Sequence, residues 1–278
     1  MSERSETLTP QWYDRQYDPR LPERPMPTII ADWISRSEIT RARYAPATLA
    51  YGSQALENVD LYRAPNAKGA LVFYHGGYWR SCSKDEHGWI AQDFVGAGIT
   101  VAVMNYPLCP EVTLREINAS VGRGLGYLYR EALSEVERDK LVVAGHSAGG
   151  YLAVAQMLVD WEAVGLPRSP FAGVLALSGL FDLQPLTYTQ MNSWLKLDAG
   201  TAQELSLADR TPRVSAPVSL AVGALESSEF QRQSRDLGAA WPHCVKRVTA
   251  LPGRNHFDAL DDLTLGGRLF DFISEALG

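Results

Sequence analysis

Short apolar runs alternate with longer helical patterns along most of this chain. The runs are rich in β-branched residues and have the length of buried strands; they cover 59–62, 70–74, 99–105, 141–144, 173–177, 218–222 and 245–251. Apolar residues recur at helical spacing in the segments 85–95, 114–132, 148–161, 229–240 and 263–276. This alternation predicts an α/β fold, in which a mostly parallel sheet carries helices on both faces.

The first fifty residues do not follow this alternation. Prolines are closely spaced within them, at Pro19, Pro22, Pro25 and Pro27. Within them, only 28–37 shows a short helical pattern. We therefore predict an N-terminal extension at 1–50 that packs on a single domain at 51–278, and this extension could contribute a lid.

Composition narrows the range of partners. The 278 residues are 46% apolar and 21% charged, which is typical of a globular domain. The formal net charge of −6, without a Lys/Arg cluster, gives no reason to expect nucleic acid or a membrane as partner. We expect a small-molecule substrate, while the oligomeric state is not determined and a homodimer stays open.

The cysteines and the first residues of the chain indicate in which cellular compartment the protein is expected. Cys82, Cys109 and Cys244 are odd in number and widely spaced, which favours reduced thiols. The first residues lack an apolar signal segment, and no window approaches the roughly 18 apolar residues of a membrane span. We expect a cytoplasmic protein.

The strongest chemical signal is GHSAGG at 145–150, which lies between a predicted strand and a predicted helix. G-x-S-x-G in this setting predicts a nucleophile elbow, in which Ser147 sits on a strained turn. Glycine is needed at Gly145 and Gly149 because side chains there would collide with neighbouring backbone. A glycine-rich turn that holds a serine without chemistry is the alternative, and the flanking strand and helix favour the elbow.

The segment YHGGYW at 74–79 follows the strand 70–74 and suggests a partner for that serine. Acyl transfer through a serine creates an oxyanion, which backbone N–H groups must stabilise. We predict that Gly76, Gly77 and Tyr78 form this oxyanion hole together with Ala148. His75 is expected to hold the loop by hydrogen bonding rather than to act as a base.

A serine hydroxyl also needs an imidazole that accepts its proton. Downstream of Ser147 the chain has only His243 and His256. His243 precedes a predicted strand, where a surface or packing role is expected. His256 lies in a Gly/Asn loop between the strand 245–251 and the final helix, and we predict that it is the base.

The acid that orients this base is expected after a late strand. Glu226 lies a few residues past the strand 218–222 and is our candidate. Glu229 is the rival, although the first turn of a helix favours a carboxylate there for its dipole alone. Asp182 and Asp258 are weaker rivals.

The sequence lacks the motifs that are typical of metal-binding and dinucleotide-binding sites. The five histidines show no HExxH or other closely spaced ligand pattern; they are His75, His87, His146, His243 and His256. No G-x-G-x-x-G opens the first βαβ unit, since Gly122 and Gly124 sit within a helical pattern. We expect neither a metal nor a cofactor.

Several segments together resemble the α/β-hydrolase form of kynurenine formamidase, also called arylformamidase. They are YGSQALENVDLYR, HGGYW, GHSAGG, SGLFDLQPL, LESSEFQRQS and GRNHFDAL, and the similarity spans nearly the whole chain. The resemblance implies an α/β-hydrolase fold and hydrolysis of N-formyl-L-kynurenine to L-kynurenine and formate in tryptophan breakdown. It also implies a triad of Ser147, Glu226 and His256. Animal members carry Asp where Glu226 stands, but the longer side chain can still reach the imidazole.

Aromatic residues flank the predicted site loops and could bind a substituted benzene ring. They are Tyr78, Trp79, Phe181, Tyr188, Trp194 and Phe257. Each of them could equally pack the domain. Arg80, Arg254 and Asn255 are candidates for a substrate carboxylate, and nothing in the sequence singles one out.

Three other functions stay open. The same machinery would serve a carboxylesterase on small aryl or acyl esters, or a hydrolase of another amide or carbamate. A non-catalytic binding protein of this fold usually lacks a triad member, whereas every candidate is present here.

Overall fold

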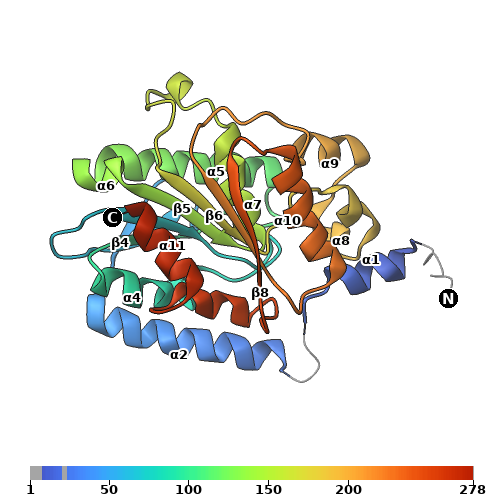
Figure 1. Cartoon of the computed structure of the whole chain (residues 1–278), viewed down its shortest axis with the longest axis horizontal. Coiled ribbons are helices and arrows are strands. Elements are labelled where there is room, and N and C mark those ends of the chain that lie inside the picture. Colours follow the sequence, from blue (N-terminus) through green and yellow to red (C-terminus); the bar gives the residue numbers. More distant parts are fainter. Residues whose placement is uncertain (1–7, 21–23, 278) are drawn as a thin grey trace.

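Eight strands form one sheet in the residues that the computed structural model describes, which are 8–20 and 24–277 (Figure 1). The strands are β1 (Ala47–Ala50), β2 (Asn58–Tyr62), β3 (Ala70–Tyr74), β4 (Thr100–Met104), β5 (Leu141–His146), β6 (Gly173–Leu177), β7 (Val218–Gly223) and β8 (Val245–Leu251). Their order in the sheet is β1-β2-β4-β3-β5-β6-β7-β8. The pairs β1–β2 and β2–β4 are antiparallel and all the others are parallel, so the prediction of a mostly parallel sheet is confirmed.

The central strands are apolar at every position because helices cover both faces. All residues of β3, β4, β5, β6 and β7 are buried. The sequence analysis did not predict β1, which pairs at the edge and exposes three of its four residues. A strand that buries so little leaves no apolar run to recognise.

Helices cover both faces of the sheet (Figure 1). One layer holds α5 (Leu114–Tyr127), α7 (Ala148–Ala155) and α10 (Ser228–Ala240), and the other holds α2 (Met26–Tyr44), α4 (Ala91–Gly96) and α11 (Arg268–Leu277). Side chains of β3 alternate between the layers, with Val72 and Tyr74 in the first core and Leu71 and Phe73 in the second. The core therefore lies on both sides of β3 and β5.

The remaining helices are short. The α-helices among them are α1 (Pro10–Tyr17), α3 (Lys84–His87), α6 (Glu135–Asp139), α8 (Asn192–Leu195) and α9 (Ala199–Leu205). Short 3₁₀ segments are η1 (Gly88–Ile90), η3 (Gln156–Leu158), η4 (Glu162–Val164), η5 (Gln184–Tyr188) and η6 (Asp258–Leu263), and η2 (Leu128–Ala132) is a π-helical segment. The expected helix at 263–276 begins only at Arg268. A Cβ on Gly267 would lie 2.3 Å from the Asp262 carbonyl oxygen, so the chain turns tightly before α11.

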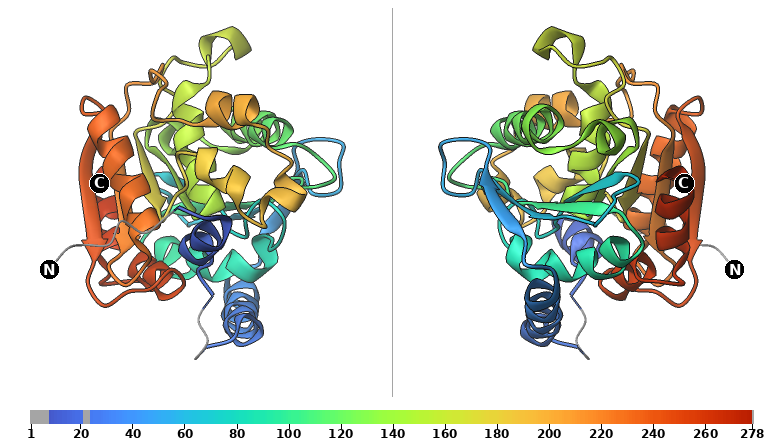
Figure 2. Two further views of the ribbon diagram at one scale, coloured as in Figure 1. Left: turned by 90° about the vertical axis from the view of Figure 1, so that its right-hand side faces the viewer. Right: turned by 90° about the vertical axis from the view of Figure 1, so that its left-hand side faces the viewer.

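Helix α1 lies at the carboxyl ends of the parallel strands (Figure 2). The buried Tyr17 hydroxyl donates to Glu229 Oε2 at 2.6 Å, and the Gln16 carbonyl accepts from the Ser227 hydroxyl at 2.6 Å. Residues 1–7 and 21–23 of the predicted extension, and Gly278, lie outside the described residues. Among the helices described, none is both long and apolar enough to cross a bilayer.

Candidate active site

Ser147 lies on the sharp turn between β5 and α7. Its φ of 55° and ψ of −119° are strained for a residue with a side chain, and its N–H donates to the Leu177 carbonyl at 2.8 Å. A Cβ on Gly145 would lie 2.1 Å from the Gly149 carbonyl oxygen, and one on Gly149 would lie 2.0 Å from that of Tyr74. Both glycines are therefore required for the close approach of β5, α7 and β3.

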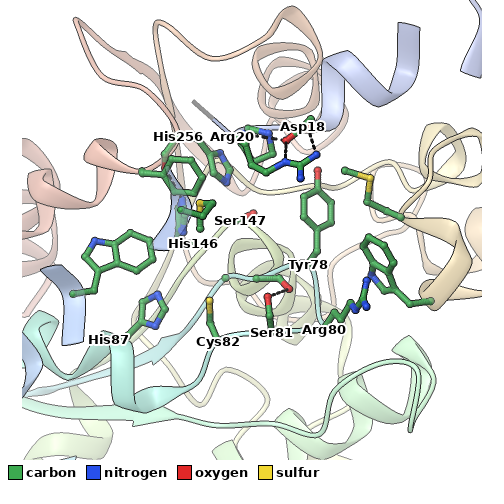
Figure 3. Close-up of a pocket in the computed structure, with 18 of the residues that line it drawn as sticks. Asp18, Arg20, Tyr78, Arg80, Ser81, Cys82, His87, His146, Ser147 and His256 are labelled. Carbon is green, nitrogen blue, oxygen red and sulfur yellow. Dashed lines mark hydrogen bonds and ion pairs between the residues drawn. The ribbon is translucent and has the colours of Figure 1, made fainter. Parts of the chain in front are cut away.

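His256 and Glu226 form a buried hydrogen-bonded pair beside this turn. His256 Nδ1 lies 2.6 Å from Glu226 Oε2, and both side chains are under 5% exposed. A carboxylate can only accept, so Nδ1 carries the hydrogen of this bond, and in the neutral form of the ring Nε2 then has the lone pair. Ser147 and His256 line the same pocket (Figure 3). A serine hydroxyl and an imidazole that is bound to a carboxylate thus line one pocket, and these are the groups that activate a serine for attack.

Two more donors fix the carboxylate. Glu226 Oε1 accepts from the backbone N–H of Gly223 at 2.7 Å and from the Ser178 hydroxyl at 2.5 Å. The sequence analysis missed Ser178. Its position at the carboxyl end of β6, beside the predicted acid loop after β7, is the signal that could have found it.

Replacing Ser178 by alanine is expected to lower kcat/KM about tenfold. The change removes one charge-assisted hydrogen bond from the group that orients His256. Steady-state kinetics on any substrate that the protein turns over would measure this loss. Ser219→Ala is the matched control, because Ser219 is a buried serine of β7 that makes no hydrogen bond to Glu226. Equal activity of the two variants would contradict the expected contribution of Ser178.

The rival carboxylates serve other contacts. Besides the hydrogen bond from Tyr17, Glu229 Oε2 accepts one from Arg232 at 2.9 Å, and Asp182 Oδ2 accepts one from Arg232 at 3.2 Å. Asp258 accepts hydrogen bonds from the backbone and side chain of Asn255. These carboxylates therefore hold α1, α10 and the loop around His256 in place.

His243 is exposed and does not line the pocket. It lies in the turn before β8, and its carbonyl accepts a hydrogen bond from the Lys246 ammonium at 2.8 Å. Of the two downstream histidines, His256 lines the pocket with Ser147 and His243 does not.

The loop after β3 lies directly against the serine turn. A Cβ on Gly76 would lie 3.3 Å from Ser147 Cβ, and one on Gly77 would lie 2.1 Å from the Ser81 carbonyl oxygen. Gly77 has a φ of 106° and Tyr78 a φ of 52°, so the loop needs glycine and carries strain. Ala148 begins α7, where the first N–H groups have no partner within the helix. Backbone donors thus approach Ser147 from two segments.

His75 lies beneath this loop rather than in the pocket. Its Nδ1 is 2.7 Å from the Gly76 carbonyl oxygen, and its ring stacks on Tyr106 with centroids 4.2 Å apart. Burial, helped by nearby His87, lowers the pKa of His75 to about 3. The ring is therefore neutral near pH 7 and anchors the loop.

His146 joins the serine turn to the loop of the base. Its Nε2 donates to the His256 carbonyl at 2.8 Å. Burial, followed by the nearby His256 ring, lowers the pKa of His146 well below its ordinary value. A neutral His146 thus ties the residue before Ser147 to the backbone of His256.

The pocket above Ser147 has a volume of about 480 Å³ (Figure 3). Of the six aromatic residues proposed to bind a substrate ring, Tyr78, Trp194 and Phe257 line it. Trp33 and Met26 from α2 also line it, and the sequence analysis missed both because α2 precedes every motif of the site.

The other three aromatic candidates lie elsewhere. Trp79 is fully buried against Tyr151, and Phe181 is buried in the same core. Tyr188 is 57% exposed and stacks on Tyr13 of α1. The expectation that these three contact a substrate is not met, because they pack the domain or its surface.

Within the described part of the chain, no group of three His, Cys, Asp or Glu side chains is placed to hold a metal ion. Cys82 lines the pocket, where burial raises the pKa of its thiol to about 11. That thiol is protonated near neutral pH and is a weak nucleophile. Ser147 is accordingly the best-supported nucleophile of the pocket.

Comparison with known proteins gives consistent matches. A model of the alpha/beta hydrolase fold family matches residues 71–219. Kynurenine formamidase of Danio rerio is 28% identical over 266 residues, and the match covers 87% of this chain and 88% of the relative. Kynurenine formamidase of Salmo salar is 27% identical over 260 residues, and the match covers 86% of this chain and 87% of the relative. A crystal structure from a Silicibacter species, with a provisional thioesterase assignment, has a TM-score of 0.83 and 30% identity, covering 94% of this chain and 98% of its own. The resemblance inferred from the motifs is confirmed.

Proposed function

The chain belongs to the α/β hydrolase fold family, and from this premise we propose that it is a serine hydrolase that cleaves aryl formamides. Its substrate under this proposal is N-formyl-L-kynurenine, which it converts to L-kynurenine and formate. One observation carries the proposal: a strained serine and a buried imidazole–carboxylate pair line one pocket. The similarity to fish kynurenine formamidases supports the choice of substrate.

In the first half of the reaction Ser147 attacks the formyl carbon while His256 Nε2 takes its proton. The Glu226 carboxylate holds the imidazole in the required tautomer and stabilises the imidazolium that forms. Negative charge develops on the formyl oxygen, and the N–H groups of the 76–78 loop and of Ala148 stabilise it. His256 then protonates the nitrogen as the C–N bond breaks, and the aryl amine leaves.

In the second half water attacks the formyl ester on Ser147. His256 takes the proton of this water and returns a proton to the Ser147 oxygen as the ester bond breaks. Formate leaves and the free enzyme is restored. The residues named supply the nucleophile, the base and the oxyanion donors of these steps, and water is the co-substrate.

Ester hydrolysis is the second candidate function. The Silicibacter neighbour with the provisional thioesterase assignment is 30% identical over most of this chain, and the same residues would cleave a reactive acyl ester. The two functions differ in the bond that is cleaved, so substrate comparison separates them.

The test is the release of L-kynurenine from N-formyl-L-kynurenine, followed by the absorbance of the aromatic amine. We expect a kcat/KM of about 10⁴ M⁻¹s⁻¹ or more, the lower end of ordinary enzyme efficiency. p-Nitrophenyl acetate is assayed in parallel. Turnover of the ester together with no turnover of the formamide would overturn the formamidase proposal in favour of an esterase.

A further inference from the structure

Among the described residues, and apart from the histidines, three charged side chains line the pocket: Asp18, Arg20 and Arg80. Asp18 and Arg20 pair with one another, and Arg20 Nε lies 2.7 Å from Asp18 Oδ1. Burial alone would raise the pKa of Asp18, but the hydrogen bonds from Arg20 outweigh it and lower that pKa. These two charges therefore offset one another, whereas Arg80 has no counter-charge among the described residues that line the pocket.

Arg80 has no carboxylate partner among the described residues. Its guanidinium carbon lies 4.3 Å from the ring centroid of Trp194, which also lines the pocket. Stacking on an aromatic face orients the guanidinium plane and leaves its N–H edges available for a planar anion. A carboxylate is the group that such a fork binds with two parallel hydrogen bonds.

The backbone fixes Arg80 relative to the reacting centre. Arg80 N–H donates to the Gly77 carbonyl at 3.0 Å, so the residue belongs to the loop that packs on Ser147. In Figure 3, Asp18, Arg20 and Arg80 lie on the side of Ser147 away from His87. Trp33 packs on His87 and Phe257 with centroids 5.1 and 6.3 Å apart, which makes the His87 side aromatic. The pocket is therefore charged on one side of Ser147 and apolar on the other.

We propose that Arg80 binds a carboxylate on the leaving group of the substrate. This inference rests on the proposed function, under which the carboxylate is that of the amino-acid head of kynurenine. Of the three candidates from the sequence, Arg254 pairs with Asp262 at 2.9 Å and Asn255 with Asp258 at 2.8 Å, and neither lines the pocket. Arg80 is the candidate that lines the pocket without a carboxylate partner among the described residues.

The test compares substrates with and without the head. The ratio of kcat/KM for N-formyl-L-kynurenine to that for ortho-formamidoacetophenone, which keeps the aryl ketone but lacks the amino-acid group, is measured in each variant. Arg80→Gln is expected to lower this ratio about 10- to 100-fold, the effect of one charge-assisted pair. The ratio for Arg80→Lys should lie between those of the wild type and Arg80→Gln, because a lysine keeps the charge but loses the planar guanidinium group.

Arg43→Gln is the matched control, because Arg43 is exposed and stacks on Tyr44 with its guanidinium carbon 5.1 Å from the ring centroid, outside the pocket. Its ratio should equal that of the wild type. An unchanged ratio in Arg80→Gln, with formamide turnover present, would overturn the assignment of Arg80 and leave the proposed function standing.

A second pair of substrates tests the assignment of Arg80 separately from the proposed formamidase function. The ratio of kcat/KM for meta-acetoxybenzoate to that for its methyl ester reports the preference for an anionic leaving group without any formamide. A loss of this preference in Arg80→Gln supports the assignment even if the wild type cleaves no formamide, an outcome that would overturn only the proposed function.

Discussion

Replacing Ser147 by alanine is expected to lower kcat by about 10⁴- to 10⁶-fold while the protein stays folded. The hydroxyl is the attacking group of the proposed reaction, and alanine has no oxygen that could form the formyl ester. The strained backbone at this position, with φ of 55°, is set by β5 and α7 rather than by the hydroxyl. Steady-state turnover and circular dichroism of the purified variant measure the two parts of this prediction.

The control for this variant is Ser234→Ala. Ser234 is a buried serine of α10 whose hydroxyl makes no hydrogen bond in the described structure, so its loss tests the removal of a buried oxygen alone. Its turnover should match that of the wild type. Near-normal turnover by Ser147→Ala would instead show that the nucleophile lies elsewhere.

Replacing Glu226 by glutamine is expected to lower kcat by about 10³- to 10⁴-fold. Glutamine keeps the shape of the side chain but loses the charge that stabilises the imidazolium. Its amide can also turn an N–H toward His256 and favour the wrong tautomer, which leaves no lone pair for the proton of Ser147. Single-turnover kinetics report the loss at the chemical step.

Glu229→Gln is the matched variant for this test. Glu229 is also largely buried and lies three residues further along, but it accepts hydrogen bonds from Tyr17 and Arg232 rather than from His256. We expect less than about a tenfold loss of kcat together with a lower melting temperature, because the contact between α1 and α10 weakens. A larger loss of kcat in Glu229→Gln than in Glu226→Gln would identify Glu229 as the acid.

The positions of Ser147, Glu226 and His256 could be predicted from the sequence because each lies next to a recognisable strand or turn. The elbow around Ser147 needs glycine at two fixed positions, and the strand and helix beside it are apolar enough to recognise. Strand β7 and the loop after β8 likewise place Glu226 and His256 at predictable points of the alternation. Parallel strands bring such carboxyl ends together at one edge of the sheet.

The walls of the pocket were less predictable because they come from segments distant in sequence. Asp18 and Trp33 line the pocket from the N-terminal part of the chain, where no motif marks a contact. Tyr78 lines the pocket, whereas the next residue, Trp79, is buried in the core. Both residues have a positive φ, and this backbone conformation turns their side chains in different directions. Only the path of the backbone distinguishes them.

The role of the N-terminal extension as a lid stays a prediction. In the described part, the Tyr78 hydroxyl donates to the Tyr17 carbonyl, and Asp18, Pro19 and Arg20 line the pocket beside His256. Through these contacts, residues 18–20 form part of the pocket lining.

The most direct measurement of the central claim is covalent labelling by a fluorophosphonate, followed by peptide mass spectrometry. We predict one adduct per chain, located on Ser147, with loss of activity in step with labelling and much slower labelling in His256→Ala. Full activity without an adduct, or stoichiometric labelling at another residue, would contradict the account.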